Sequence, residues 1–196
     1  MRLFIVRHGE TFANEKGIAC GWYNSRLNKI GLGQSKKLAS RLLNEKIDII
    51  FCSDLIRCRQ TIKPYLEKIK IKIHYTKLLR ERHYGIFDGK PISSIIEWFN
   101  NNPGKDPNGW ESTERFMERM SKFISENFPN MKCKNVLVVT HGRAKRMLLE
   151  ILLAKSEKDK ERIKERVHNT GLSIIDFSDD ENPILELLNC NKHLDK

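Results

Sequence analysis

The chain has 196 residues and a formal net charge of +11, from 36 Lys and Arg against 25 Asp and Glu. At roughly 150 residues per domain, this length predicts a single domain, spanning 1–196, with a buried core. Hydrophobic residues make up 39% and charged residues 31%, which excludes a disordered chain and a membrane protein. The positive charge indicates an anionic partner: nucleic acid, a membrane surface or phosphorylated substrates.

The cysteines and the N-terminus indicate a reducing compartment. An odd number of cysteines without CxxC or zinc-site spacing is typical of reduced thiols. The N-terminal sequence has only four consecutive apolar residues before Arg7, too few for the core of a signal peptide. We therefore expect a cytoplasmic protein without membrane association. The five cysteines are Cys20, Cys52, Cys58, Cys133 and Cys190.

Short runs rich in Ile and Val alternate with longer helical patterns, and such runs are typical of strands buried on both faces. In chain order, the predicted elements are strand Leu3–Val6, helix Leu32–Lys46, strand Ile47–Cys52, helix Asp54–Ile69, strand Ile71–Tyr75, helices Pro91–Asn100 and Glu111–Phe128, strand Val136–Thr140, helix Arg143–Leu153, and strands Leu172–Phe177 and Ile184–Leu188.

This alternation predicts an α/β fold, a three-layer sandwich with a mostly parallel central sheet flanked by helices. The helices between about 90 and 130 are expected to form a small cap over the carboxyl ends of the strands. Asp54 is an N-cap-type residue, and Pro64 should kink or divide its helix. The mixed charges of Ser156–Arg166 are typical of a solvated helix.

Arginine, histidine and glutamate follow four of the predicted strands. Arg7 and His8 follow the first strand, Arg57 the second, Glu81 the third and His141 the fourth. In open α/β sheets, ligands bind outside the carboxyl ends of the strands. We therefore expect these five side chains to converge on one site.

These residue types suit phosphoryl transfer without a metal ion. A transferring phosphoryl group carries negative charge on three oxygens, which Arg7 and Arg57 can bind in bidentate fashion. His8 is the better candidate nucleophile, because a neutral imidazole can attack phosphorus. His141, if cationic, would donate another hydrogen bond, and Glu81 would protonate the leaving oxygen. The sequence has no carboxylate cluster suited to Mg²⁺ and no P-loop, so we expect no metal and no cofactor.

Five motifs occur in order along nearly the whole chain: Arg7–Thr11 with Asn14, Gly21–Tyr23, Ser53–Leu55 with Arg57, Leu79–Glu81 continuing to Gly89, and Val138–Gly142. Together they resemble the histidine phosphatase superfamily, also called the phosphoglycerate mutase-like family. The resemblance implies that His8 carries the phosphoryl group, bound by Arg7, Arg57 and His141, while Glu81 donates a proton and later activates water. The substrate-binding residues it implies are Asn14, Gly21, Tyr84 and Gly142.

The resemblance leaves two branches open. Glu81–Gly85 reads like the glycolytic mutases, whereas Phe87–Gly89 reads like the phosphatases. The mutases carry a longer insertion with paired arginines, but here 55 residues separate Gly85 from His141, with no adjacent Arg pair. We therefore expect a histidine acid phosphatase-type phosphoric monoester hydrolase that acts on a small phosphorylated metabolite. The alternative is a cofactor-dependent phosphoglycerate mutase.

Plainer interpretations also stay open. Glu81 could form a surface salt bridge with Arg80 or Arg82, Tyr84 could simply pack in the core, and His83 could be a substrate contact or a buried imidazole. A third hypothesis, suggested by the positive charge, is a module that binds a polyanion or a protein, although nucleic acid is only a remote candidate for the partner. Most of the excess charge reads as solvated surface that steers phosphorylated substrates. A homo-oligomer is left open.

Overall fold

The computed structural model describes residues 1–131, 134–153, 161, 163, 167–178 and 183–195. Within these residues, six strands form a central sheet in the order β3-β2-β4-β1-β5-β6. Four strands run parallel: β1 (Arg2–Arg7), β2 (Ile49–Ser53), β3 (Lys72–Thr76) and β4 (Asn135–Thr140). On the other side of β1, β5 (Leu172–Asp176) pairs antiparallel with β1, and β6 (Ile184–Cys190) pairs antiparallel with β5.

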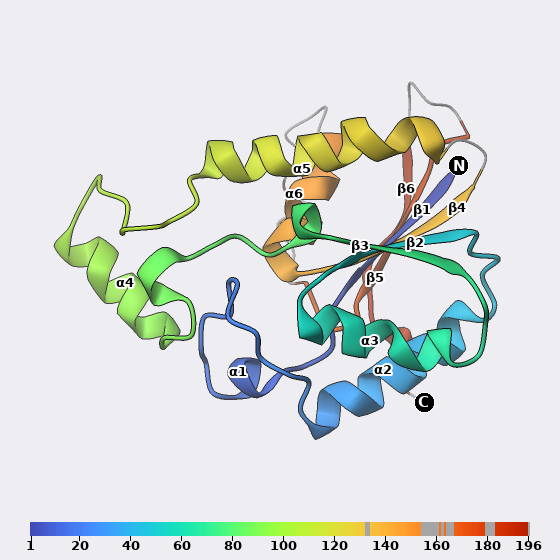
Figure 1. Ribbon diagram of the computed structural model, residues 1–196, viewed down its shortest axis with the longest axis horizontal. Coiled ribbons are helices and arrows are strands. Elements are labelled where there is room, and N and C mark those ends of the chain that lie inside the picture. Colours follow the sequence, from blue (N-terminus) through green and yellow to red (C-terminus); the bar gives the residue numbers. More distant parts are fainter. Residues whose placement is uncertain (132–133, 154–160, 162, 164–166, 179–182, 196) are drawn as a thin grey trace.

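Helices cover both faces of the sheet (Figure 1). On one face lie α5 (Thr113–Asn127) and α6 (Gly142–Leu153), and on the other lie α2 (Lys29–Leu42) and α3 (Ile56–Leu66). Successive side chains of a strand point to opposite faces, so each buried parallel strand contributes residues to two hydrophobic cores, one on each face of the sheet. In β1, Leu3 and Ile5 pack with α5 and α6, whereas Phe4 and Val6 pack with α2 and α3. The predicted α/β sandwich is therefore confirmed.

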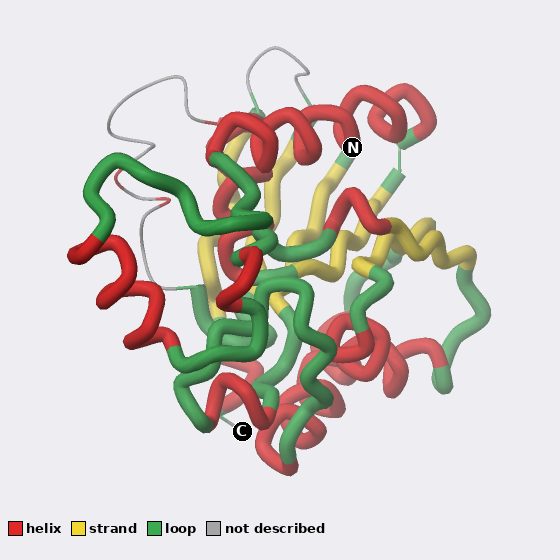
Figure 2. Tube along the Cα trace, turned by 60° about the vertical axis from the view of Figure 1, so that its left-hand side comes forward, coloured by secondary structure: helices red, strands yellow, loops and turns green. Residues whose placement is uncertain are grey.

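Two shorter helices lie beyond the carboxyl ends of the parallel strands, α1 (Phe12–Glu15) and α4 (Ile92–Asn101). Figure 2 shows α4 standing away from the sheet on the same side as the loops that leave these strands. Of the two helices expected in the cap, only α4 occupies this position. The other, α5, covers the sheet and buries Phe116, Met120 and Phe123 in the core.

Two local expectations are wrong. β3 is not buried on both faces but is the outer strand of the sheet, with Tyr75 41% exposed, because it pairs only with β2. Asp54 does not cap a helix, since Leu55 holds the N-cap position of α3. The Asp54 carboxylate instead accepts hydrogen bonds from Nε and Nη2 of Arg80, at 2.7 and 2.6 Å. α3 continues through Pro64 and ends two residues later.

Some expectations fall outside the part of the chain that the structure describes. Cys133 does, and so does the charged segment Ser156–Arg166, apart from Glu161 and Ile163. Among the described residues, no helix has both the length and the apolar character needed to cross a membrane.

Candidate active site

The carboxyl ends of neighbouring strands bring the predicted residues together. β1 and β4 pair in parallel with Arg7 opposite Thr140, so His8 and His141 follow at equivalent positions. The centroids of the two imidazole rings lie 5.2 Å apart, and the ring planes are inclined by 62°. Arg57 joins them from the first turn of α3, and Glu81 comes from the loop after β3. This is the convergence that the sequence predicts.

A cavity of about 600 Å³ opens at these strand ends. His141 does not line it, because its side chain is fully buried against Arg57. His83 does not line it either, and its Nδ1 donates to the carbonyl oxygen of Gly109 at 2.7 Å. The other predicted site residues all line the cavity: Arg7, His8, Asn14, Gly21, Arg57, Glu81, Tyr84 and Gly142.

His8 is buried and held in one tautomer. Its Nδ1 lies 2.7 Å from the carbonyl oxygen of Gly9. A carbonyl oxygen only accepts, so Nδ1 carries the proton and Nε2 keeps its lone pair. Burial, followed by the charges of Arg57 and Arg7, lowers the pKa of His8 well below its usual value. The ring is therefore neutral, which is the form that a nucleophile needs.

Gly9 is required by a close approach of two backbone segments. A Cβ at this position would lie 2.8 Å from the carbonyl oxygen of Gly31 in α2. The loop is also fixed by its N–H groups, since Gly9 N donates to Thr61 Oγ1 at 2.9 Å. The polar loop after β1 is thus clamped between α2 and α3.

His141 is neutral, contrary to the expectation of a cationic donor. The Nε of Arg57 donates to its Nδ1 at 3.0 Å, so the proton of the ring is on Nε2, which lies 2.8 Å from Ser53 Oγ. Burial, followed by the charge of Arg57, lowers the pKa of His141 well below its usual value. A fully buried ring beside a guanidinium cannot readily take up a proton. His141 therefore orients Arg57.

Arg57 is fully buried, and three acceptors fix its guanidinium. Besides His141, these are the carbonyl oxygens of Tyr23, at 2.8 Å from Nη1, and of Gly21, at 2.7 Å from Nη2. Gly21 has a φ of 40°, and a Cβ there would collide with the carboxylate of Asp88. Glycine is therefore needed for this carbonyl to reach the arginine.

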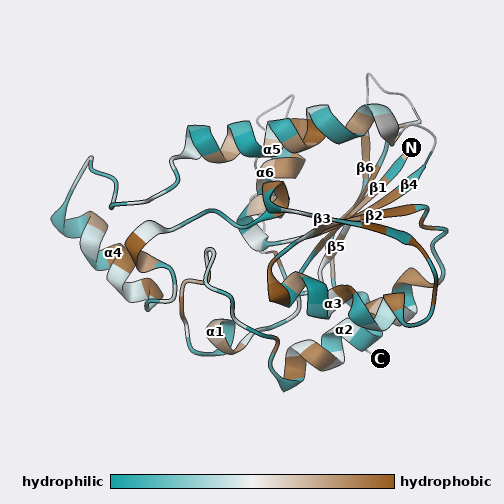
Figure 3. Ribbon diagram, in the orientation of Figure 1, coloured by the Kyte–Doolittle hydropathy of each residue, from teal (hydrophilic) through white to brown (hydrophobic). Residues whose placement is uncertain are grey.

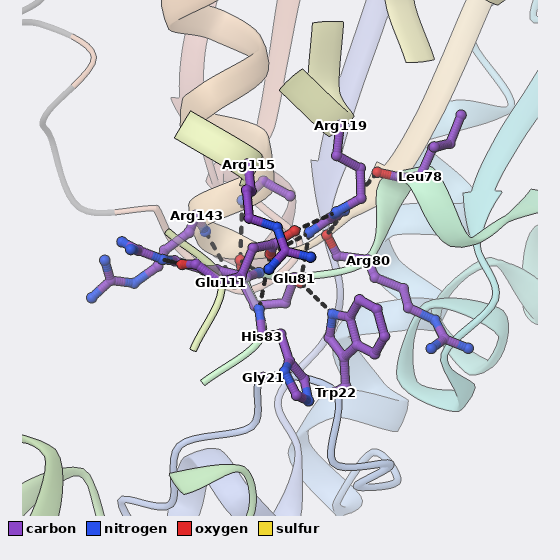
Figure 4. A network of polar contacts seen from close by, with 12 residues as sticks. Gly21, Trp22, Leu78, Arg80, Glu81, His83, Glu111, Arg115, Arg119 and Arg143 are labelled. Carbon is purple, nitrogen blue, oxygen red and sulfur yellow. Dashed lines mark hydrogen bonds and ion pairs between the residues drawn. The ribbon is translucent and has the colours of Figure 1, made fainter. Parts of the chain in front are cut away.

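Glu81 is buried at the start of α6, where three backbone N–H groups hold its carboxylate. Oε1 accepts from Arg82 N at 3.0 Å and from Ala144 N at 3.1 Å, and Oε2 accepts from Arg143 N at 3.1 Å. The alternative of a surface salt bridge is wrong, because Arg80 pairs with Asp54 instead. The carboxylate is thus oriented within the cavity wall (Figure 4).

The remaining predicted residues reach the cavity from separate elements. Asn14 lies in α1, and its Oδ1 accepts from Thr11 N at 3.2 Å. Gly142 is the first residue of α6. The ring of Tyr84 lies 5.4 Å from that of Trp110, another lining residue. Tyr84 is thus both packed and part of the cavity wall.

Sequence reasoning missed an ion pair that supports the Glu81 loop. Arg119, on α5, donates from Nε and Nη2 to the two carboxylate oxygens of Glu111, both at 2.8 Å. Arg119 also donates to the carbonyl oxygens of Leu78, Arg80 and Glu81 (Figure 4). Glu111 lies in a loop and Arg119 in a helix, so only the folded structure reveals that they pair.

Asn169 is a second residue whose contact is visible only in the structure. Its Nδ2 donates to the carbonyl oxygen of His8 at 3.0 Å, and Thr170 N donates to that of Arg7, also at 3.0 Å. The turn before β5 therefore holds the main chain of Arg7, the last residue of β1, and of His8, which follows it.

Comparisons with known proteins agree with this geometry. The family model for the histidine phosphatase superfamily (branch 1) matches residues 3–191. A protein of Schizosaccharomyces pombe named as a probable phosphatase is 42% identical over 146 residues, which cover 72% of this chain and 68% of that protein. A broad-specificity phosphatase of Saccharomyces cerevisiae is 33% identical over 189 residues, which cover 92% of this chain and 81% of that protein.

Solved structures show the same fold. The α-ribazole phosphatase from Shigella flexneri superimposes with a TM-score of 0.85 at 25% identity, covering 97% of each chain. The chain therefore belongs to the histidine phosphatase superfamily, as its five motifs predict.

Proposed function

We propose that the protein is a phosphomonoesterase that acts without a metal ion and through a phosphohistidine at Nε2 of His8. The proposal rests above all on one contact, the 2.7 Å hydrogen bond from Nδ1 of His8 to the carbonyl oxygen of Gly9. That bond leaves Nε2 unprotonated, in a cavity that Arg7 and Arg57 also line. The named activities of the relatives support a phosphatase.

In the first half of the reaction, Nε2 of His8 attacks phosphorus. The N–P bond forms as the bond from phosphorus to the ester oxygen breaks, and Glu81 donates a proton to that leaving oxygen. Arg7 and Arg57 bind the equatorial oxygens, on which the transferring group carries its charge. The phosphorylated ring is positively charged, and the carbonyl oxygen of Gly9 stabilises that charge through the Nδ1 proton.

In the second half, water replaces the alcohol. The Glu81 carboxylate accepts a proton from the water, whose oxygen attacks phosphorus while the N–P bond breaks. Inorganic phosphate leaves, and His8 returns to the neutral form with Nε2 unprotonated. Glu81 is again protonated and ready for the next alcohol. Arg57 must keep its position through both halves, and His141 holds it by accepting a hydrogen bond from its Nε.

The test is phosphate release from 4-nitrophenyl phosphate in excess EDTA. We expect full activity of the wild type and a loss of about a thousandfold or more in His8→Ala. His74→Ala is the control, because His74 stacks on Phe51 and does not line the cavity. Rapid quenching should trap one phosphoryl group on the wild-type protein and none on His8→Ala.

Two outcomes would contradict the proposal. Wild-type protein that is inert until a metal ion is added would rule out the metal-independent reaction. Interconversion of phosphoglycerates stimulated by a bisphosphate, faster than hydrolysis, would favour the mutase.

A further inference from the structure

The cavity extends beyond the residues that a phosphoryl group needs. Its outer part is apolar and comes largely from α4, a helix that buries none of its own side chains in the core. Ile92 and Ile96 of that helix are 49% and 59% exposed, although both line the cavity. Figure 3 shows the alternation of hydrophobic and hydrophilic residues along α4. The apolar lining residues include Ile18, Ala19, Ile92, Ile95, Ile96, Trp110 and Val167.

This apolar wall is held in place before any ligand binds. The ring of Trp110 lies between two others, 5.4 Å from that of Tyr84 and 5.2 Å from that of Phe99 on α4. Ring packing of this kind fixes both the tryptophan and the helix. The wall can therefore accept an apolar or aromatic group attached to the phosphate without first being ordered.

The cavity also has more positive charge than a phosphate monoester can neutralise. Its lining contains four arginines, Arg7, Arg57, Arg143 and Arg146, against one carboxylate, Glu81. The histidine that lines it is neutral. In the proposed reaction, Arg7 and Arg57 match the two negative charges of a phosphomonoester dianion, so the positive charge of Arg143 remains for another anion.

Arg143 is the arginine best suited to a second anion. It follows Gly142 in the first turn of α6, and its guanidinium carbon lies 5.6 Å from the centroid of the Tyr84 ring. Within the described part of the chain, Arg143 forms no ion pair, whereas Arg80 pairs with Asp54 and Arg119 with Glu111.

A second guanidinium lies close to that of Arg143. Arg82 lies over Trp110, with its guanidinium carbon 5.0 Å from the ring centroid. Burial, followed by the charge of Arg143, lowers the pKa of Arg82. Arg82 itself does not line the cavity, but the two guanidiniums repel each other, and an anion bound by Arg143 would relieve that repulsion.

We propose that Arg143 determines specificity by binding a second anionic group of the substrate, a carboxylate or a further phosphate. The substrates are then phosphomonoesters whose alcohol carries both an acidic group and an apolar or aromatic group. The apolar wall binds the apolar or aromatic group. This inference rests on the proposed function, because it assigns the phosphoryl group to His8, Arg7 and Arg57.

The test compares three substrates of similar shape: 4-carboxyphenyl phosphate, its neutral amide 4-carbamoylphenyl phosphate, and 1,4-phenylene bisphosphate. We expect wild type to prefer an acidic substrate over the amide by about tenfold or more in kcat/KM, mainly through KM. Arg143→Gln should lose that preference, and Arg143→Lys should keep part of it. Comparison of 4-carboxyphenyl phosphate with 1,4-phenylene bisphosphate identifies which anionic group the site prefers.

A matched control removes the same charge elsewhere. Arg115 is exposed on α5 and does not line the cavity, so Arg115→Gln should keep the wild-type preference within about twofold. An acidic preference that survives in Arg143→Gln would overturn the inference, and so would a wild type with no preference.

A binding measurement tests the anion site independently of the proposed reaction. In the His8→Ala background, calorimetry should show that 4-carboxyphenylphosphonate binds about tenfold more tightly than its amide, and that Arg143→Gln removes the difference. If turnover fails but this difference is seen, the proposed function is wrong and the anion site stands. If turnover succeeds and the difference is absent, the anion site is wrong and the phosphatase stands.

Discussion

The Nε of Arg57 donates a hydrogen bond of 3.0 Å to Nδ1 of His141, which joins two residues 84 positions apart in the sequence. Because a guanidinium only donates, this contact determines the tautomer of the imidazole as well as the orientation of the arginine. The same ring lies 2.8 Å from Ser53 Oγ through Nε2. Within the described residues, this buried arginine is thus positioned by a neutral histidine and two carbonyl oxygens, with no carboxylate among its hydrogen-bond partners.

The buried histidines make stability depend on pH. Burial, followed by the charge of Arg57, lowers the pKa of both His8 and His141 well below 6.5, so both stay neutral in the folded protein. In the unfolded chain they take up protons near their usual pKa. The unfolded state therefore binds more protons below about pH 6.5, and each histidine removes up to about 1.4 kcal/mol of stability per pH unit of further acidification.

Urea unfolding between about pH 7 and pH 5 measures this slope, and His141→Gln should be less sensitive to acid than wild type by up to one proton. Equal slopes for the two proteins would show that the buried ring titrates as it does in the unfolded chain.

Replacement of Arg57 by lysine should impair both catalysis and stability. A lysine ammonium cannot reach His141, Tyr23 and Gly21 with the geometry of the guanidinium. We expect kcat/KM for 4-nitrophenyl phosphate to fall by about a hundredfold and unfolding free energy by about 2 kcal/mol. Arg59→Lys, an exposed change on the same helix, is the control and should leave both within about twofold and 0.5 kcal/mol. Similar losses in the two variants would contradict the assigned role of Arg57.

Gly21→Ala should destabilise the protein more than Gly17→Ala. Both residues have positive φ values, 40° and 63°, so each substitution costs about 1–2 kcal/mol in backbone strain. Nothing lies within 4 Å of a Cβ at Gly17, whereas a Cβ at Gly21 displaces the carboxylate of Asp88. That carboxylate accepts from Trp22 N at 2.8 Å and from Tyr84 N at 3.0 Å.

The difference between the two alanine variants in urea unfolding isolates the loss of the Asp88 contacts, which we expect to add about 1–3 kcal/mol. No difference between them would mean that the Gly21 turn can shift without breaking those contacts.

Glu81→Gln should act on the leaving group. Glutamine keeps one acceptor oxygen for the N–H groups of Arg82 and Ala144, loses the acceptor that Oε2 provides for Arg143 N, and has no acidic proton for the leaving oxygen. We expect kcat/KM to fall by about 10²–10⁴ for an alkyl phosphate and by much less for 4-nitrophenyl phosphate, whose nitrophenolate needs no protonation. The ratio kcat/KM is the right measure, because it covers only the steps up to departure of the alcohol.

Glu10→Gln is the control for this experiment, since Glu10 accepts from Asn28 Nδ2 at 2.8 Å and does not line the cavity. An equal fall for both substrates in Glu81→Gln would assign Glu81 to orientation of the loop and not to proton transfer.

The strand ends could be read from the sequence because parallel strands covered on both faces are continuous apolar runs. The polar residues that follow directly, such as His8 after β1, must then lie at the carboxyl edge of the sheet. The same pattern cannot report how many neighbours a strand has. It therefore predicted β3 as buried, although β3 is the outer strand with Tyr75 exposed.

The charge states of the site residues and the contacts that support them could not be predicted from the sequence pattern. The neutral form of His141 depends on complete burial and on what faces each ring nitrogen, and those partners are 84 and 88 positions away. The pair between Glu111 and Arg119 spans eight positions from a loop into a helix, which is not a spacing that brings side chains together within one helix. Only the folded chain defines these contacts.

The register of β1 and β4 has a consequence for the order of folding. Arg7 and Thr140 are paired although they are 133 positions apart, and His8 meets His141 only after this pairing forms. Closing so long a loop opposes chain entropy, so contacts of this kind tend to form late. A slip of one residue would turn every side chain of β1 to the wrong face. Recovered activity during refolding should therefore lag behind recovered helical signal, and it should report that the central strands have found their correct register.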